Sequence, residues 1–534
     1  MGYVIGNIYV ITTVAVTGGA LFGFDIASMS AILGTQQYKC FFNQTGTTDG
    51  LCGGPTSANQ GGISASMPGG SFVGALISGI LTDWLGRKRS IQVGSLIWCI
   101  GSAIVCSSFG IPQLVVGRFI NGISVGILSA QVPVYVAELA QPSKRGTVVG
   151  AQQWAITWGI LIMFYLHDWK CCLAYPWGLQ MLPAIFLFGM VFLLPESPRW
   201  LAKHDRWEEA HEVLALVHAK GDRNASFVHT ELQEIREMVE FERHNADASY
   251  FDLFKPNMIY RTHIGMFTQI WSQLTGMNVM MLYITYVFGM AGLSGNANLV
   301  ASSIQYVINV VMTIFALIFI DRWGRRTPLL VGSTLMMIFM FANGGIMASY
   351  GKPAPPGGLN HTPEQSWDLT EAPMAAKGVI ACTYLFVASY APTWGPVSWI
   401  YPPELYPLRL RGKAVALATS SNWIFNFALS YFVPPAFENI QWKTYLVFGV
   451  FCFSMTVHVF FCFPETAGKT LEDVETMFNT PGLKPWQTKV EFQHVRKLEL
   501  GTIQSDKLAN LHAEEGTAPV SKSVEKETTV TQVE

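Results

Sequence analysis

The sequence predicts an all-α membrane protein whose twelve transmembrane helices form two six-helix halves. Half of the 534 residues are hydrophobic and only 13% are charged, whereas an ordinary soluble domain carries about 25% charged residues. Apolar runs of ~20 residues recur, and each is long enough to cross a hydrocarbon core of ~30 Å as a helix. Short charged sequences recur at equivalent places in the two sets of runs. The net charge of −2 gives no indication of a nucleic-acid partner.

The N-terminal half is expected to comprise residues 1–195. Its first apolar run has no basic segment before it and no small-residue cleavage site after it, so we interpret it as a retained helix rather than a signal peptide. Hydrophobic run length places the spans of this half at 8–33, 62–83, 91–109, 113–138, 147–167 and 174–194.

A charged segment at 196–258 separates the halves, and its sequences WEEAHEVLALVHAK and ELQEIREMVEFERH predict two short surface helices. The C-terminal half is expected at 259–465. Its spans are placed at 262–290, 299–320, 328–349, 375–402, 413–436 and 443–463. Residues 466–534 form a tail that is expected to be cytoplasmic and largely disordered after about residue 485, because it lacks the apolar content to fold alone.

Lysine and arginine crowd the loops that share a side with both termini, which makes that side cytoplasmic. These residues are Arg87, Lys88, Arg89, Lys144, Arg145, Arg322, Arg325, Arg326, Arg409, Arg411 and Lys413. The opposite loops then face outward, and two of them carry N-glycosylation sequences, at Asn43 and Asn360. A third such sequence, at Asn224, falls on the cytoplasmic side and should stay unmodified.

The nine cysteines follow no metal-binding spacing, and most lie in apolar runs where a packed, inert thiol is expected. Cys40 and Cys52 share one outward polar loop, and we weigh a disulfide between them equally against two free thiols. The sequence shows no Ser/His/Asp or metal constellation. Neither an enzyme nor a bound cofactor or metal is therefore predicted.

Two charged sequences of the first half return in the second. GILTDWLGRKR at 79–89 corresponds to IFIDRWGRRT at 318–327, and VAELAQPSKRG at 136–146 corresponds to PPELYPLRLRG at 402–412. We expect ion pairs between neighbouring helix ends to form a cytoplasmic gate that holds the halves together: Asp83 with Arg87, Glu138 with Arg145, Asp321 with Arg325, and Glu404 with Arg411. The alternative is that these charges only set the topology.

One carboxylate and one guanidinium fall inside predicted spans, Asp25 in LFGFDIASMS and Arg118 in GRFINGISVGI. An ionised group at the bilayer centre costs at least ~3 kcal/mol, so we expect these two residues to pair. A purely structural pair is the alternative, but ionisable residues inside a membrane more often mark function. Gly122 and Gly126 on the same span are expected to let two helices approach closely.

Uncharged polar residues form a second set within the spans. Amides donate and accept hydrogen bonds, which suits vicinal hydroxyl groups, and an indole suits the face of a pyranose. This is the chemistry of a sugar site. The alternative is that each amide makes a helix–helix hydrogen bond worth about 1 kcal/mol or less. The set consists of Gln153, Gln273, Asn278, Asn309, Asn422 and Asn426, with Trp399 and Trp423.

The sequence resembles the sugar porter family of the major facilitator superfamily over nearly the whole membrane region. The resemblance rests on the combination of DWLGRK, GRFINGISVGI, PESPRWL, QLTGMN, DRWGRR and PETAGKTLEDVE, and FGFDIASMSA and TQIWSQLTGMN are most similar to fungal high-affinity glucose and xylose transporters. It implies the major facilitator fold and sugar-binding positions at Gln153, Gln273, Asn278, Asn309, Trp399 and Asn422. Many members carry glutamine where this chain has Ser272, which leaves the preferred sugar open.

The resemblance also implies that Asp25, paired with Arg118, is the proton site of coupled members, although some uncoupled members keep an aspartate there. We therefore expect a transporter that moves a monosaccharide, either glucose or a related hexose or xylose, across the plasma membrane with proton symport. Its partners would be the sugar, the proton and the lipid bilayer, and a monomer would suffice. An uncoupled facilitator is one alternative. A transporter-like sugar sensor is another, although sensors carry longer tails than residues 464–534 provide.

Overall fold

The structure, a computed structural model, describes most of the chain up to residue 488. The described residues are 5–33, 35–44, 46–48, 51–52, 54–141, 144–166, 174–244, 249–355, 357–359, 362–469, 471–480 and 482–488. Residues 1–489 form one compact unit. Residues 490–534, which hold most of the expected disordered tail, lie outside the described residues.

Five long helices and one interrupted helix build the first half. The long ones are α1 (Ile8–Leu33), α3 (Ser57–Leu85), α4 (Arg87–Cys106), α5 (Ile111–Leu139) and α6 (Arg145–Leu166). The last predicted span of this half is divided into α7 (Ala174–Leu179) and α8 (Met181–Val191). Between α1 and α3 lie a short helix, α2 (Gln36–Phe41), and an antiparallel pair of two-residue strands, β1 (Thr47–Thr48) and β2 (Leu51–Cys52), in which Thr47 faces Cys52.

Helices α3 and α5 touch through their backbones. A Cβ atom at Gly126 would lie 2.1 Å from the carbonyl oxygen of Ser71, and one at Gly122 would lie 2.1 Å from that of Met67. Any side chain larger than hydrogen would therefore force the helices apart. The expected close approach at these glycines is present, and it fixes α5 against α3 at the level where Arg118 lies.

The segment between the halves contains three helices and one 3-10 turn. These are α9 (Pro198–Lys203), α10 (Trp207–His218), α11 (Ser226–His244) and η2 (Tyr250–Phe254). The two sequences predicted to be surface helices are α10 and α11. An ion pair of 3.4 Å between Arg199 and Glu231 ties α9 to α11.

The second half contains more interruptions than the first. Its elements are α12 (Ile259–Leu274), α13 (Met277–Leu282), α14 (Ile284–Met290), α15 (Gly295–Trp323), α16 (Arg326–Tyr350), β3 (Lys352–Pro353), β4 (Trp367–Asp368), α17 (Pro373–Tyr390), α18 (Trp394–Leu405), α19 (Leu408–Asn439), α20 (Lys443–Cys462), α21 (Leu471–Asn479) and η4 (Pro485–Gln487). Strands β3 and β4 pair antiparallel, with Lys352 opposite Asp368.

Two breaks in these helices have identifiable causes. Gly276 separates α12 from α13 with a φ of +83°, a conformation that L side chains rarely adopt. The ring of Phe448 packs against it, 2.9 Å from where a Cβ atom would lie. Pro392 lies in the turn between α17 and α18, where it cannot donate a backbone hydrogen bond. Both breaks interrupt apolar runs that the sequence presents as continuous.

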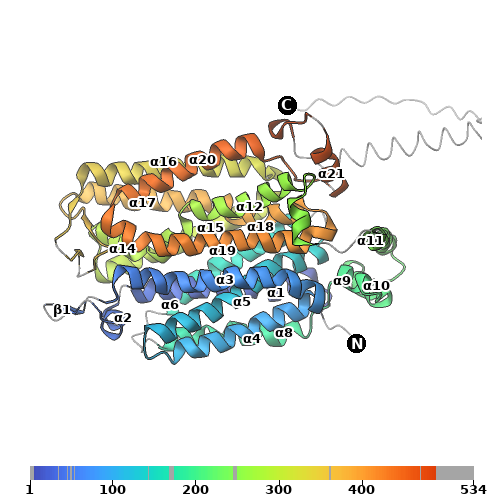
Figure 1. Ribbon diagram of the computed structural model, residues 1–534, viewed down its shortest axis with the longest axis horizontal. Coiled ribbons are helices and arrows are strands. Elements are labelled where there is room, and N and C mark those ends of the chain that lie inside the picture. Colours follow the sequence, from blue (N-terminus) through green and yellow to red (C-terminus); the bar gives the residue numbers. More distant parts are fainter. Residues whose placement is uncertain are drawn as a thin grey trace, which may run out of the picture. The chain divides into compact units, whose positions relative to one another are not determined.

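Within the described ranges, nine helical segments are long and apolar enough to cross a membrane. The other predicted spans, at 174–194, 262–290 and 413–436, fall on α7–α8, α12–α14 and α19. Helices α3 and α19 lie side by side where the halves meet, and α6 and α15 make a second contact between the halves (Figure 1). Figure 1 also shows α9, α10 and α11 at one end of the membrane helices and α2 at the other. We call these the linker end and the disulfide end.

Candidate functional site

A buried ion pair joins the first and fourth membrane helices. Two nitrogens of Arg118 on α5 donate to the two carboxylate oxygens of Asp25 on α1, at 3.2 and 2.9 Å. The remaining guanidinium Nε donates to the carbonyl oxygen of Ile63 on α3 at 3.1 Å. Asp25 is 3% exposed and Arg118 is 2% exposed. Three helices therefore meet at one charge pair, and the protonation of one carboxylate can alter how all three are held.

The second half contains a chain of hydrogen-bonded amides next to the break at Gly276. Asn278 Nδ2 donates to Gln273 Oε1, and Gln273 Nε2 donates to Asn422 Oδ1, both at 2.8 Å. Asn422 Nδ2 in turn donates to Gln269 Oε1 at 2.5 Å. The sequence interpretation missed Gln269, although it lies one helical turn before Gln273. The break allows α12 and α13 to present their amides together.

The other predicted sugar-site residues lie in different surroundings. Gln153 on α6 accepts a 3.0 Å hydrogen bond from the indole nitrogen of Trp399 on α18, which links the two halves. Asn309 on α15 is buried, and its Oδ1 has no hydrogen-bond partner among the described residues. Ser272, at the position where the sequence departs from many sugar porters, shares a 3.0 Å hydrogen bond with the hydroxyl of Tyr390. Polar groups of this kind, which have few or no hydrogen-bond partners within the protein, can form hydrogen bonds with the hydroxyl groups of a ligand.

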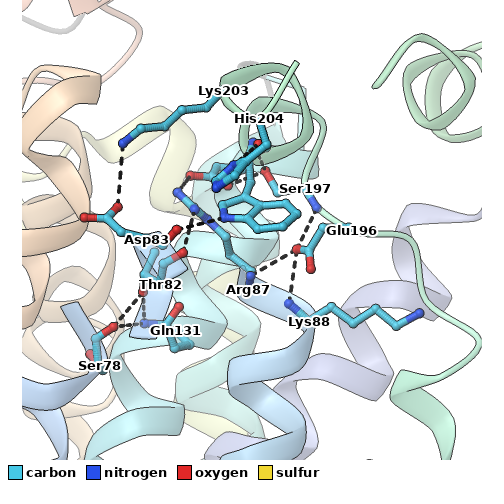
Figure 2. A network of polar contacts seen from close by, with 12 residues as sticks. Ser78, Thr82, Asp83, Arg87, Lys88, Gln131, Glu196, Ser197, Lys203 and His204 are labelled. Carbon is cyan, nitrogen blue, oxygen red and sulfur yellow. Dashed lines mark hydrogen bonds and ion pairs between the residues drawn. The ribbon is translucent and has the colours of Figure 1, made fainter. Parts of the chain in front are cut away.

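The charged motifs of the first half form a network at the linker end (Figure 2). Arg87 Nη2 binds Glu138 at 2.8 Å, and Glu138 also accepts from the hydroxyl of Ser197. The backbone nitrogens of Arg87 and Lys88 both donate to Glu196 Oε1, at 3.0 and 3.1 Å. Burial raises the pKa of the Glu196 carboxyl, and the hydrogen bonds from these backbone nitrogens lower it in part.

The same arrangement returns in the second half. Arg325 Nη2 binds Glu404 at 2.8 Å, and Glu404 also accepts from Thr466 at 2.7 Å. The backbone nitrogens of Arg325 and Arg326 donate to Glu465, at 2.8 and 3.0 Å. Glu196 and Glu465 were not identified from the sequence as site residues. Each follows a proline just after the last span of its half, in PESPR and PETAG, and that repetition was the available signal.

The expected pairing of these charges was partly wrong. Asp321 does bind Arg325, at 3.3 Å. Arg87, however, binds Glu138, and no ion pair joins it to Asp83 in the part of the chain that the structure describes. Glu138 is likewise held by Arg87 and not by Arg145 among the described residues. Glu404 is held by Arg325, as stated above.

The remaining members of these predicted pairs have other contacts. Arg411 donates to the backbone oxygen of Tyr406 at 3.3 Å. Arg145 lies within electrostatic reach of Arg199 and of the carboxylates Glu404, Glu231 and Glu138. The physical reason for the differences is that Arg87 and Arg325, each of which follows a glycine with a φ near +83°, reach a glutamate on another helix of the same half. They thereby take the partners that were expected for Arg145 and Arg411.

The arginine–glutamate pairs therefore tie helices together within a half, and other contacts, one of them at Asp321, join the halves at the linker end. Lys413 on α19 binds Asp83 on α3 at 3.3 Å. Thr147 on α6 donates to Asp321 on α15 at 2.9 Å through its hydroxyl. Asp83 also lies 3.8 Å from Lys203 of α9.

The halves also touch at the disulfide end. Lys39 Nζ of α2 donates to Thr362 Oγ1 at 2.6 Å, and the hydroxyls of Ser30 and Tyr306 lie 2.9 Å apart. Cys40 and Cys52 form a disulfide that connects α2 to the loop before α3. Asn43 is exposed in this loop, whereas Asn360 lies outside the described residues. The halves therefore touch at both ends, while the ion pair is buried among helices of the first half and the chain of amides among helices of the second.

Comparisons with known proteins agree with this architecture. The profile of the family described as Sugar (and other) transporter matches residues 11–478. The High-affinity glucose transporter of Kluyveromyces lactis is 46% identical over 489 residues, covering 90% of this chain and 87% of that protein. The MFS glucose transporter mfs1 of Aspergillus flavus is 42% identical over 540 residues, covering 98% and 99%.

Among solved structures, the proton:xylose symporter XylE bound to 6-bromo-6-deoxy-D-glucose is similar, with a TM-score of 0.73 and 26% identity over 88% of this chain and 99% of XylE. This likeness confirms the major facilitator fold that the sequence predicted.

Proposed function

Because the chain belongs to the family of sugar transporters, and is not an enzyme, we propose that it carries a monosaccharide across the plasma membrane together with a proton. The observation that carries this proposal is the buried pair of Asp25 and Arg118. An ionised group enclosed between membrane helices costs ~3 kcal/mol or more of desolvation unless it is matched, which favours a role in proton coupling over binding of a neutral sugar alone.

The sugar is proposed to bind to the buried amides and the indole between the halves. These residues are Gln153, Gln273, Asn278, Asn309, Trp399 and Asn422, to which the geometry adds Gln269. Glucose or a related hexose is the favoured substrate because both curated relatives are named as glucose transporters. Xylose stays a candidate because XylE, which is titled a xylose symporter, has a similar fold.

The proposed coupling begins at Asp25. When its carboxylate takes up a proton, the charge that holds Arg118 is lost, and the bond between α1 and α5 weakens. Helix α1 also touches the second half, where the rings of Phe22 and Trp423 pack 4.8 Å apart. A shift of α1 therefore reaches both halves. If protonation and sugar binding favour the same state, each must strengthen the other by linkage.

Alternating access follows from contacts that can break at one end at a time. The structure with both ends closed suits an occluded state, from which either the Lys413–Asp83 contact or the Lys39–Thr362 contact can release. We propose that the linker end and both chain termini face the cytoplasm, on the strength of the Lys/Arg distribution. A single chain encloses the proposed site, so a monomer embedded in the bilayer suffices.

Uptake of labelled glucose and xylose into transporter-deficient cells tests the proposal. Wild-type uptake should collapse with a protonophore and rise as the external pH falls. Asp25→Asn, which mimics the protonated form, should abolish uphill accumulation but keep exchange of sugar across the membrane. Uptake that is insensitive to protonophore and pH would make the protein a facilitator, with Asp25 a structural partner of Arg118. Absence of any uptake from correctly localised protein would favour a sensor.

A further inference from the structure

The loop between β3 and β4 reaches across the disulfide end to the first half. Thr362 of this loop accepts the 2.6 Å hydrogen bond from Lys39 on α2. Two residues later, the carboxyl group of Glu364 lies within electrostatic reach of Lys39 and next to Ser57, the first residue of α3. The disulfide between Cys40 and Cys52 holds α2 in place against this contact. The contact therefore places a carboxyl group of the second half against two elements of the first.

Glu364 is buried although it belongs to a loop. Only 3% of it is exposed, and Lys39 is only 6% exposed. Among the described residues, the charged and titratable groups that interact with it are Tyr38 and Lys39 of α2, Tyr283 and Tyr286 next to and within α14, and Glu438 of α19. Lys39 is the cation of this set and Glu438 is the second carboxyl, so the surroundings do not fully compensate an ionised Glu364.

Burial, helped by the negative charge of Glu438, raises the pKa of Glu364, while its backbone hydrogen bond, Ser57 and Lys39 lower it; the net pKa is about 7, against an ordinary 4.5. When the halves separate at this end, Ser57 and Lys39 move away and water reaches the carboxyl. Its pKa then returns toward that of an ordinary glutamate, about 4.3. The closed state thus binds the proton more tightly than the open one, so protonation favours closure.

We propose that Glu364 is a second proton-binding site of this transporter, and that its protonation favours closure of the two halves at the disulfide end. The step is the uptake of one proton by a carboxylate, and no other bond changes. A proton from the external side would thus favour occlusion of a loaded sugar. The inference rests on the proposed alternating-access function, in which this end opens and closes.

Spin labels on either side of the contact measure the opening directly. Gln37 on α2 and Met374 on α17 are both exposed, so Gln37→Cys and Met374→Cys can carry the labels, with the parent protein reporting background labelling. The Asp25→Asn background removes the titration of Asp25. From the closed-state pKa of about 7 and the ordinary value of about 4.3, the closed-to-open ratio should be about tenfold higher at pH 6 than at pH 8.

Variants at Glu364 and its neighbours give separate tests of this site. Glu364→Gln keeps a hydrogen-bonding side chain but cannot titrate, so its closed-to-open ratio should not change between pH 6 and pH 8. Glu438→Gln should move the midpoint to lower pH, and Lys39→Met should move it to higher pH. Glu371→Gln, at a residue just after β4 with a 75% exposed side chain, should leave the profile unchanged.

The inference is overturned if Glu364→Gln keeps the pH dependence, or if the two neighbour variants shift the midpoint in the same direction. These results do not depend on sugar uptake. A failure at Glu364 leaves symport through Asp25 intact, and uptake that ignores the proton gradient leaves the spin-label result unaffected.

Discussion

Replacing Arg325 by alanine should lower the free energy of unfolding. Replacing Asp83 by asparagine should instead shift the equilibrium between the closed and open states of the linker end. Arg325 is 4% exposed as a side chain and binds Glu404, which is 14% exposed, at 2.8 Å. Removing one partner of a buried pair costs about 3–5 kcal/mol, because the other charge stays buried without it. All the groups involved belong to the second half, so this loss should fall on the free energy of unfolding.

The Asp83 carboxylate gives the opposite expectation. It is 42% exposed and binds Lys413 across the halves at 3.3 Å. Screened pairs of this kind contribute about 0.2–1 kcal/mol, so unfolding should hardly change. The same energy acts directly on the opening of the linker end, where about 1 kcal/mol shifts the equilibrium roughly fivefold.

Two measurements on the same purified variants separate these effects: thermal unfolding, and label distances across the linker end. Arg322→Ala, at an exposed arginine on the last turn of α15, is the matched control. If Arg325→Ala unfolds like the wild type while opening the linker end, then the network holds the halves together after all, and the assignment of its pairs to single halves is wrong.

Two further changes test the sugar site and the helix contact. Asn278→Ala leaves Gln273 Oε1 without its donor. Because an unpaired buried group costs about 1–3 kcal/mol, the sugar concentration at half-maximal uptake should rise about tenfold. An unchanged value at normal surface expression would remove Asn278 from the site. Gly126→Ala places a Cβ atom 2.1 Å from a backbone oxygen of α3 and should lower the free energy of unfolding by about 1–3 kcal/mol. Gly62→Ala, where a Cβ atom meets nothing within 4 Å, is its control, and equal melting temperatures for the two variants would contradict the backbone contact.

Hydropathy predicted the membrane helices well because the cost of exposing a polar backbone to lipid dominates their formation. It did not predict the breaks at Gly276 and Pro392, because apolar residues continue on both sides of each break. The pairing of Asp25 with Arg118 could be predicted from the free-energy cost of an ionised group inside the membrane, because each such group needs an opposite charge nearby.

The gate pairs were harder because spacing along the chain favours local partners. Asp321 and Arg325 pair as their spacing suggests. Asp83 and Arg87 have the same spacing, but Asp83 forms its ion pairs with Lys413 and Lys203, which lie far away in the sequence. Only the folded chain shows which of several nearby charges is closest.

The hydrogen bonds at Glu196 and Glu465 fix the segments that follow these two residues to their own halves. Helix α9 is bound to the first half by the hydrogen bond of Trp200 to the backbone oxygen of Asp83, at 3.3 Å. The last described segment is bound to the second half, where the backbone nitrogen of Glu465 donates to Thr488 at 2.7 Å. A movement of one half therefore carries with it the segment that is attached to it. The position of α9 outside the membrane helices thus reports the position of the first half.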